Sequence, residues 1–264
     1  MKDILKMKTS RILQLLTLAI CTVAIAIPLA NAAAPHPAGS DKHASIYGFD
    51  YSHQHAWHVE SGDSQSPINI DTKEVTRADS FSDEDDTLSI HSGHAHAKVI
   101  DTGHTIQIVP GSGSAKIRGR YFTLQQIHFH APAEHTLDGN TYPLEGHFVF
   151  RAQNGRLAVV AVFYRPGAEN AQFAAAMRAT KHRETTEMAS FDADALLPKH
   201  IGRYYHYLGS LTTPPLTENV EWYIIADPVE LSVADIAAFT QHYSHNARQT
   251  QPLKGRPLLQ YDVH

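Results

Sequence analysis

The sequence predicts a mainly β protein, a single domain with a large, mostly antiparallel central twisted sheet and a few short surface helices. Three observations lead to this prediction. Thr87–Ile100 and His104–Val109 alternate between apolar and polar residues, and a Gly/Ser-rich turn then leads into a further strand over Ala115–His130. Leu157–Tyr164 is continuously apolar, which is typical of a strand buried on both faces. No internal repeat and no linker divides the chain.

Two segments depart from the β pattern and predict short helices. Within residues 170–182, apolar side chains recur at i, i+3, i+4 and i+7, the spacing of an amphipathic helix. Ser232–Asp235 is typical of a capping box, and an apolar stripe of helical period follows it. Between these helices one face of another strand carries Val220, Trp222 and Ile224.

Residues 1–32 have the organisation of a cleaved secretory signal peptide. Four basic residues precede the apolar run Ile12–Ile27, and an A-x-A ending closes at Ala32. The apolar run is 16 residues long, short of the roughly 20 that a spanning helix needs, so a retained membrane anchor is the less favoured alternative. Residues 33–45 predict a disordered arm and 46–264 the folded domain. The leader predicts a periplasmic or secreted protein.

The charge argues against some classes of partner, and the cysteine content excludes a disulfide in the mature chain. The chain carries a formal net charge of −5, and without the leader 18 basic and 26 acidic residues give −8. Such an acidic balance argues against nucleic acid and anionic membranes as partners. The one cysteine, Cys21, lies in the leader, so the mature chain has no disulfide and its stability must come from the core.

Three histidines suggest a metal site. His128 and His130 are two residues apart in a predicted strand, so their imidazoles project from one face. A turn-rich interval at 138–140 precedes a second apolar run, which can place His147 on a neighbouring strand opposite them. Three neutral imidazoles with no obvious fourth protein ligand form the arrangement of a catalytic zinc site with an open position. The sequence therefore predicts one Zn²⁺ per chain at these histidines.

Two polar residues are placed to support these histidines. Gln126 shares the strand face of the first two, and Glu145 shares the face of His147. Each can bond to a ring nitrogen and fix its tautomer, as the outer partners of metal ligands do. Glu134 lies in the loop between the strands, where an exposed carboxylate is the simpler interpretation. An H-x-H pair alone is a weak signal, because paired strand histidines are often solvated.

A larger set of motifs resembles the α-class carbonic anhydrases. They occur in order from Gln65 to Arg256: Q-S-P-I-N-I (65–70), G-H-T-I-Q (103–107), Q-I-H-F-H (126–130), E-H-T (134–136), E-G-H (145–147), Y-H-Y-L-G-S-L-T-T-P-P-L (205–216) and Q-P-L-K-G-R (251–256). Their order and spacing together are highly specific. The resemblance implies the α-carbonic anhydrase fold and zinc-dependent, reversible hydration of carbon dioxide to bicarbonate and a proton, with zinc hydroxide as the nucleophile.

The resemblance also implies roles around the zinc. Thr212 and Glu134 would orient the hydroxide: if the Thr212 proton goes to the carboxylate, the threonine oxygen must accept from the hydroxide. Thr212 alone would be a turn hydroxyl before two prolines. Thr213 corresponds to the position near the bicarbonate product. The resemblance also assigns five residues to an apolar wall that holds carbon dioxide: Val149, Val159, Leu211, Val220 and Trp222. Taken singly, each of them would be interpreted as an ordinary core residue.

Among the remaining histidines the resemblance singles out His104. It matches the family's proton shuttle, because an imidazole can relay the proton released at the metal to buffer. The alternative for His104 is a surface histidine in a strand. His135 matches a structural position of the family. The other histidines, with His91, His94 and His96 among them, have no implied role and are interpreted as solvated or as a weak metal-binding tract.

The sequence departs from the family at one recurrent feature. Many exported members carry a disulfide between a cysteine shortly before Q-S-P and one directly after T-T-P-P. Here Ser61–Ser64 contains no cysteine and Leu216 occupies the second position. Ala131 also stands where some members carry tryptophan. Neither change removes a group that the chemistry needs.

The combined prediction is an exported carbonic anhydrase, a zinc lyase acting on carbon dioxide and bicarbonate. Simple anions and deprotonated sulfonamides are expected to inhibit it at the zinc, and no membrane insertion is expected after signal cleavage. The sequence leaves the oligomeric state open, with a homodimer among the alternatives. Two other functions remain: a catalytically silent carbonic-anhydrase-like binding module, and a periplasmic zinc-binding protein built on the many histidines.

Overall fold

The structure is a computed structural model that describes residues 49–59, 62–78 and 88–263. The predicted signal peptide and arm lie outside the described residues, so their boundaries stay predictions. Within the described part of the chain no helix is both long enough and apolar enough to cross a membrane.

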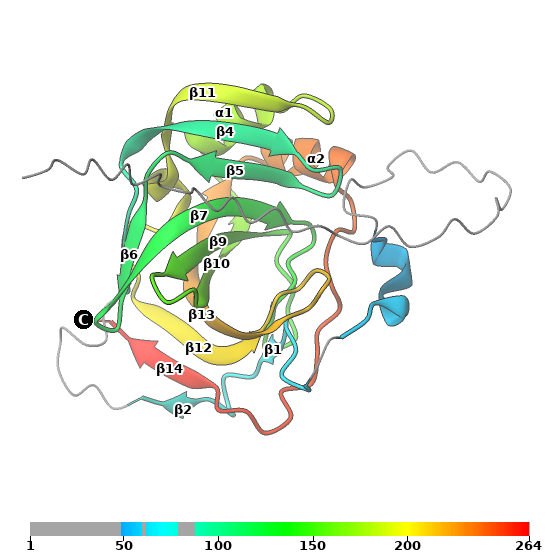
Figure 1. The fold of residues 1–264 in the computed structure, drawn as a ribbon, viewed down its shortest axis with the longest axis vertical. Coiled ribbons are helices and arrows are strands. Elements are labelled where there is room, and N and C mark those ends of the chain that lie inside the picture. The colour runs from blue at the N-terminus through cyan, green and yellow to red at the C-terminus, as the bar shows by residue number, and fades with distance from the viewer. Residues whose placement is uncertain (1–48, 60–61, 79–87, 264) are drawn as a thin grey trace, which may run out of the picture. The chain divides into compact units, whose positions relative to one another are not determined.

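One mixed sheet of twelve strands is the main element of the described structure (Figure 1). Its main path runs β11 (Thr185–Asp192), β4 (His94–Asp101), β5 (Ile106–Pro110), β7 (Arg120–His130), β9 (Leu144–Ala152), β10 (Leu157–Pro166), β13 (Glu218–Leu231), β12 (Arg203–Ser210), β14 (Leu259–Asp262) and β2 (Thr76–Arg77). Off this path, β3 (Leu88–His91) pairs with β6 (Ser114–Ile117), which pairs with β7. Short strands β1 (Asn69–Ile70) and β8 (Thr136–Leu137) pair separately.

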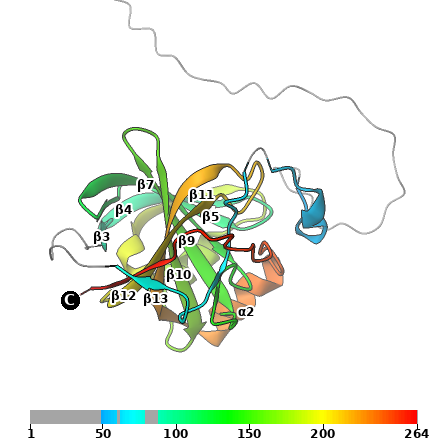
Figure 2. The ribbon, with the colours of Figure 1, turned by 90° about the horizontal axis from the view of Figure 1, so that it is seen from below.

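The sheet confirms the predicted fold class and adds a parallel centre. Most neighbouring strands are antiparallel, but β10 and β13 are parallel, as are β14 and β2. A parallel pair needs a crossover connection, and here α1 (Ala171–Ala179), β11, η2 (Ala193–Leu196) and β12 lie in sequence between β10 and β13. Figure 2 shows the twist of the sheet, as expected for L-residues.

Two predicted strands are interrupted by tight turns. The prediction of an unbroken strand over Ala115–His130 is wrong, because Arg118 and Gly119 adopt positive φ values of 48° and 74° and turn β6 back against β7. The strand predicted over Thr87–Ile100 is likewise divided at Ser92–Gly93 into β3 and β4. A carboxylate, Asp194, accepts the Ser92 amide at 2.9 Å and so stabilises that turn.

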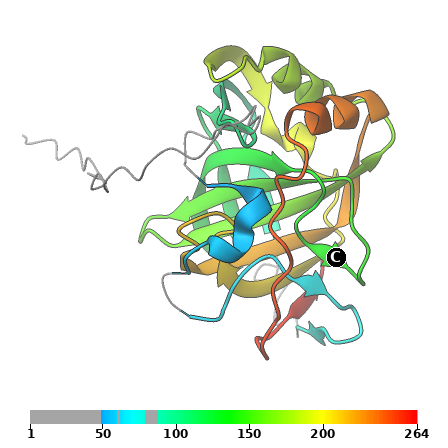
Figure 3. The same ribbon diagram turned by 90° about the vertical axis from the view of Figure 1, so that its right-hand side faces the viewer.

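Both predicted helices form. The Asn170 side chain caps α1 by accepting the amides of the second and third helical residues, each at 3.1 Å. Ser232 caps α2 (Val233–His242) by accepting the Asp235 amide at 3.0 Å, as the capping-box prediction requires. The two helices lie together near the β11 end of the sheet (Figures 1 and 3). A short 3-10 helix, η1 (Tyr51–Ala56), precedes the first strand.

The central strands bury both faces. Phe148 and Phe150 on β9 and Val160 on β10 belong to the larger core, together with Phe173 of α1 and Phe239 of α2. The opposite face carries a second, smaller core that includes residues of β1, β10, β12 and β13. The predicted metal ligands of β7 and β9 lie on this second face, because residues two apart on a strand point the same way.

Candidate metal centre

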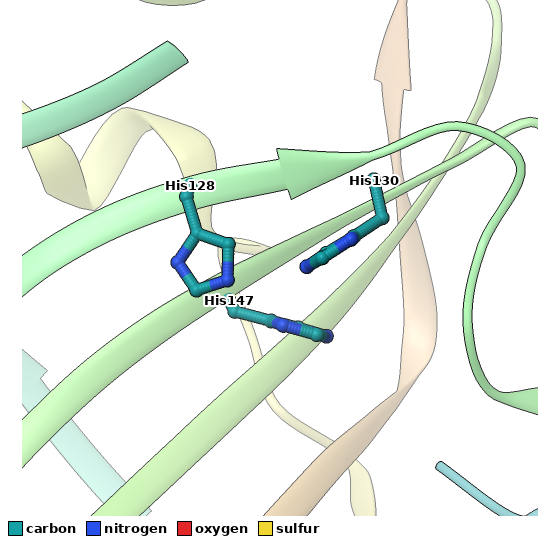
Figure 4. A group of neighbouring side chains, drawn as sticks. All are labelled: His128, His130 and His147. Atoms are coloured by element: carbon teal, nitrogen blue, oxygen red, sulfur yellow. The ribbon is translucent and has the colours of Figure 1, made fainter. Parts of the chain in front are cut away.

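Three imidazoles converge where β7 and β9 pair. His128 lies directly opposite His147 in the antiparallel register, and His130 is two residues further along the same face of β7. Their ring centroids are 5.0, 5.1 and 4.6 Å apart. Figure 4 shows the rings pointing toward one another, and one nitrogen from each lies within 4.8 Å of the others. The predicted arrangement of three histidines is therefore present.

Each ring has one nitrogen bonded to an oxygen acceptor. Gln126 Oε1 lies 2.9 Å from His128 Nδ1, and the carbonyl of Asn246 lies 2.7 Å from His130 Nδ1. Glu145 Oε1 lies 2.8 Å from His147 Nε2. Because these oxygens only accept, each bonded nitrogen carries the proton and the other nitrogen keeps a free lone pair. The predicted contacts of Gln126 and Glu145 are confirmed.

The free nitrogens fit a metal ion. His130 Nε2 is buried and has no hydrogen-bond partner among the described residues. Burial lowers the pKa of all three imidazoles, and the neighbouring rings add to the effect at His128 and His130. The pKa of His130 falls to about 3. The rings are therefore neutral at physiological pH, as metal ligation requires. Each ring is fixed through one nitrogen and can offer the other nitrogen to a metal ion, as the ligands of a metal site do.

A buried chain of hydrogen bonds holds Glu145 in place. Its Oε2 accepts the amides of Glu134 and His135, each at 2.8 Å, and its Oε1 lies 2.7 Å from His135 Nδ1. His135 Nε2 continues to the Tyr207 hydroxyl at 2.8 Å, which donates to Ser66 Oγ at 2.8 Å. Burial alone would raise the pKa of Glu145, but His135 and His147 hold it well below its usual value. His135 thus has the structural role that the resemblance implied.

Glu134 is buried beside the histidines. Its Oε1 lies 3.4 Å from His130 Nδ1 and accepts the Arg248 amide at 2.7 Å. Burial raises the pKa of Glu134 well above its usual value, while the Arg248 amide and a hydrogen bond from Thr212 act to lower it. Thr212 itself is only 5% exposed. The two residues that the resemblance pairs are therefore in contact, and the simpler interpretation of Glu134 as an exposed carboxylate is wrong.

The five residues assigned to the apolar wall belong to one cluster. Val159 lies opposite both Val149 and Trp222 in the strand register, and Leu157, at the start of the same strand, lies opposite Val220. Leu211 and Val149 are partly buried against this cluster, whereas the other three are buried. The Trp222 ring is 4.9 Å from that of His147. The wall therefore continues the smaller core directly from the metal centre. Thr213 follows Thr212 and is partly exposed.

His104 lies in the turn between β4 and β5, not in a strand, because β5 begins only at Ile106. Its ring stacks on Phe49 at 4.2 Å and meets the edge of Tyr51 at 5.6 Å. Tyr51 is the first residue of η1, and Phe49 lies just before it. Figure 3 shows η1 beside the segment after α2. The Gln54 side chain of η1 joins the two, because it donates to the Ala247 carbonyl and accepts the Gln249 amide. Partial burial lowers the pKa of His104, while Asp50 acts to raise it.

Sequence reasoning missed several residues of this centre. Asn246 donates to the carbonyls of His104 and Phe129 and accepts the Ala131 amide, while its own carbonyl holds His130. Arg248 provides the amide for Glu134, and Tyr51 covers His104. Asn246 lies 116 residues after His130 in an irregular segment, so no periodicity or local motif points to it.

A three-histidine centre that could hold a metal ion lies on one face of a large twisted β-sheet, and comparisons with known proteins identify the family that has this architecture. The model of the eukaryotic-type carbonic anhydrase family matches residues 51–261. A carbonic anhydrase of Pectobacterium carotovorum is 38% identical over 76% of this chain and 81% of its own.

Solved structures agree with the sequence match. The α-carbonic anhydrase of Thermovibrio ammonificans, in complex with the inhibitor sulfanilamide, gives a TM-score of 0.70 at 36% identity, covering 75% of this chain and 87% of its own. Carbonic anhydrase Cah3 of Chlamydomonas reinhardtii, in complex with acetazolamide, gives 0.72 at 27% identity, covering 86% and 99%. The chain belongs to the eukaryotic-type, or α, carbonic anhydrase family. It is accordingly a carbonic anhydrase, an enzyme of the lyase class.

Proposed function

We propose that this chain catalyses the reversible hydration of carbon dioxide to bicarbonate and a proton with one zinc ion held by His128, His130 and His147. The single observation that carries the proposal is the convergence of three neutral imidazoles whose outer nitrogens are all bonded to acceptors. Zinc in such a site makes a water-derived nucleophile available near neutral pH, the chemistry for which carbonic anhydrase is the standard example.

The chain's own residues would orient the nucleophile. Glu134 is fixed by the Arg248 amide at 2.7 Å, so its carboxylate can accept the Thr212 hydroxyl proton. The threonine oxygen then has only lone pairs left and must accept a hydrogen bond from the nucleophile. The lone pair of the nucleophile is therefore free to point at the substrate. The positive charge of the loaded site favours the ionised form of Glu134 that this requires.

The apolar wall would hold the substrate. Carbon dioxide has no net charge and no hydrogen to donate, so a surface of valine, leucine and tryptophan side chains can accept it without leaving a polar group unpaired. Thr213, partly exposed beside Thr212, is assigned to the side where the anionic product leaves.

His104 would remove the proton. Every turnover in the hydration direction releases one proton, and an imidazole that titrates near neutrality can pass it to buffer. The position of His104 supports this role, because Tyr51 contacts its ring. Burial raises the pKa of Tyr51, and the nearby Glu134 carboxylate raises it further, so Tyr51 lies between His104 and the centre.

Two other functions predict different metal contents. Catalytically silent relatives usually lose a zinc ligand, whereas this chain retains all three histidines together with Thr212 and Glu134. A zinc-binding protein built on many histidines predicts several weakly held ions. The exposed histidines of β4, His94 and His96, pair instead with Asp192 and Glu187 at 3.8 and 2.8 Å.

The test is stopped-flow carbon dioxide hydration on the purified chain, with zinc counted in the same sample. We expect fast hydration and one zinc per chain, both lost in His130→Ala and both retained in His96→Ala, which removes an exposed histidine. One zinc without hydration would favour the silent module. Several ions per chain, with the number falling in His96→Ala, would favour the zinc-binding protein.

Inhibitor binding, export and assembly complete the proposal. Sulfanilamide and acetazolamide are bound in the two solved relatives, and we infer that sulfonamides and small anions bind the open position here. We also infer a periplasmic or secreted enzyme that starts at Ala33 and inserts in no membrane. Mass spectrometry of the protein from separated cell fractions tests this: an intact leader in the membrane fraction would contradict it. Light scattering decides between a monomer and a homodimer.

A further inference from the structure

Asp101, the last residue of β4, is a buried carboxylate that the proposed chemistry does not use. Its side chain is only 5% exposed, although no residue of the apolar wall or of the metal centre bonds to it. A carboxylate with so little access to water must be paired, because an unpaired buried charge is strongly destabilising.

The partners of Asp101 come from three parts of the chain. Its Oδ1 accepts the Gly103 amide at 2.8 Å, and its Oδ2 accepts the Arg183 amide at 2.9 Å. His182 Nδ1 lies 3.4 Å from Oδ2, and the Tyr243 hydroxyl at the end of α2 also bonds to the carboxylate. Burial raises the pKa of Asp101, but these hydrogen bonds outweigh it and keep the pKa below its usual value.

The Asp101 carboxylate shapes the turn that carries His104. Gly103 has a φ of 81°, a left-handed value that places its amide toward Oδ1, and this residue directly precedes the histidine. Thr102 Oγ1 accepts the amides of His104 and Thr105 at 3.3 and 3.1 Å, so the turn is held from within as well. The same carboxylate fixes this turn to the α1–β11 loop through Arg183 and to the end of α2 through Tyr243.

We propose that Asp101 is a positioning residue for proton transfer: it anchors the 101–105 turn to the α1–β11 loop and to α2, and so holds the His104 ring under Phe49 and Tyr51. This inference rests on the proposed function, since it assigns His104 the task of carrying the proton. Asp101 itself touches neither substrate nor metal ligand.

The two oxygens of Asp101 allow graded variants. Asp101→Asn keeps an amide oxygen that can accept from Gly103, but it loses the second acceptor, which binds the Arg183 amide. Asp101→Ala loses both. Tyr243→Phe removes one hydroxyl and retains the ring in the core, so it serves as the variant least prone to disturb folding. We expect proton transfer to slow most in Asp101→Ala, less in Asp101→Asn and least in Tyr243→Phe.

The chain offers a matched control at the other end of β4. Asp194 accepts the amides of Ser92 and Gly93 at 2.9 and 3.4 Å, and the Ser92 hydroxyl at 2.9 Å. It therefore clamps a turn in the same manner, but a turn that carries no residue of the site. Asp194→Ala is expected to lower the free energy of unfolding without lowering kcat relative to kcat/KM.

The experiment separates kcat from kcat/KM on zinc-loaded enzyme. Removing the proton limits kcat but follows the step that kcat/KM reports, so a shuttle defect lowers kcat alone. For Asp101→Ala we expect kcat to fall by up to about 100-fold, the loss that a misplacement of a reacting group by about 1 Å can cause. Kcat/KM should stay unchanged, added imidazole should restore kcat, and Asp101→Ala should cost nothing further in a His104→Ala background.

Other results would overturn the inference or the proposed function separately. If Asp101→Ala lowers kcat and kcat/KM equally, if imidazole fails to restore kcat, or if Asp194→Ala gives the same split, Asp101 is a stabilising residue only. If Asp101→Ala does not fold, an unchanged kcat in both Asp101→Asn and Tyr243→Phe overturns the inference. A wild-type enzyme that binds zinc but does not hydrate carbon dioxide would instead overturn the proposed function.

Discussion

At the scale of single residues, the metal centre depends on where each imidazole keeps its proton. His128 and His130 are held through Nδ1 and His147 through Nε2, so the free nitrogens are Nε2, Nε2 and Nδ1. The nitrogen that bonds to the acceptor decides this: Gln126 and the Asn246 carbonyl bond to Nδ1 of their rings, whereas Glu145 bonds to Nε2 of His147. Burial then keeps all three rings neutral.

The metal-free protein should lose stability as the pH falls. The folded imidazoles have pKa values below the usual value of about 6.5, so between the folded and unfolded pKa values the unfolded chain binds more protons. Each ring therefore removes about 1.4 kcal/mol per pH unit once the pH drops below its unfolded pKa. Urea unfolding of metal-free protein at several pH values measures the slope. His130→Gln should make it shallower, and exposed His55→Gln should leave it unchanged; equal slopes in all three proteins would contradict the argument.

At the scale of elements, polar contacts join the two segments that a disulfide links in many exported relatives. Glu218 at the start of β13 accepts the Ser64 amide at 2.7 Å and the Gln65 side chain at 3.0 Å. Gln65 also donates to the Leu216 carbonyl at 3.3 Å, and Arg256 donates to the Gln65 carbonyl at 2.8 Å. This network fixes the segment before Q-S-P against the segment after T-T-P-P, so the missing disulfide leaves both in place.

Replacing Glu218 by Ala should destabilise the enzyme by about 1–3 kcal/mol, because two partly buried donors lose their acceptor. Denaturant unfolding measures the loss. Glu187→Ala is the matched control, since this carboxylate is 55% exposed and lies at the edge of the sheet; we expect a change within about 0.5 kcal/mol there. Equal effects of the two variants would show that the Glu218 contacts contribute nothing to stability.

At the scale of the whole molecule, the segment after α2 connects the three-histidine centre to His104, the proposed proton-transfer residue. Asn246 bonds to His104 and Phe129 through its side chain and to His130 through its carbonyl. Two residues later, Arg248 holds Glu134 through its amide and Gln65 through its guanidinium. Parts of the chain more than 100 residues apart are therefore tied to one irregular segment.

Asn246→Ala should remove three buried hydrogen bonds and lower the free energy of unfolding by about 2–4 kcal/mol. The backbone carbonyl that holds His130 remains, so zinc should still bind. Thermal or urea unfolding with zinc counted alongside tests both statements. Asn154→Ala, at an exposed turn where the side chain accepts only the Arg156 amide, should change stability by about 0.5 kcal/mol or less. Loss of zinc in Asn246→Ala would show that the side chain, and not only the carbonyl, maintains the centre.

The sequence by itself determined the β class, both helices and the three converging histidines that could hold a metal, with the contacts of Gln126 and Glu145. These follow from periods of two and 3.6 residues and from spacing within one strand, which depend on local geometry. The family motifs also paired Glu134 with Thr212, whose contact the structure confirms.

Only the tertiary structure decided the turns that divide two of the predicted strands, the parallel pairing of β10 with β13, and the roles of Asn246, Arg248 and Asp101. The breaks depend on left-handed φ values at Arg118 and Gly119 and on a carboxylate from a distant residue at Ser92. The other features depend on contacts between segments that share no period and no motif. Hydrogen bonds to irregular backbone arise from packing of the complete chain, so no local pattern in the sequence records them.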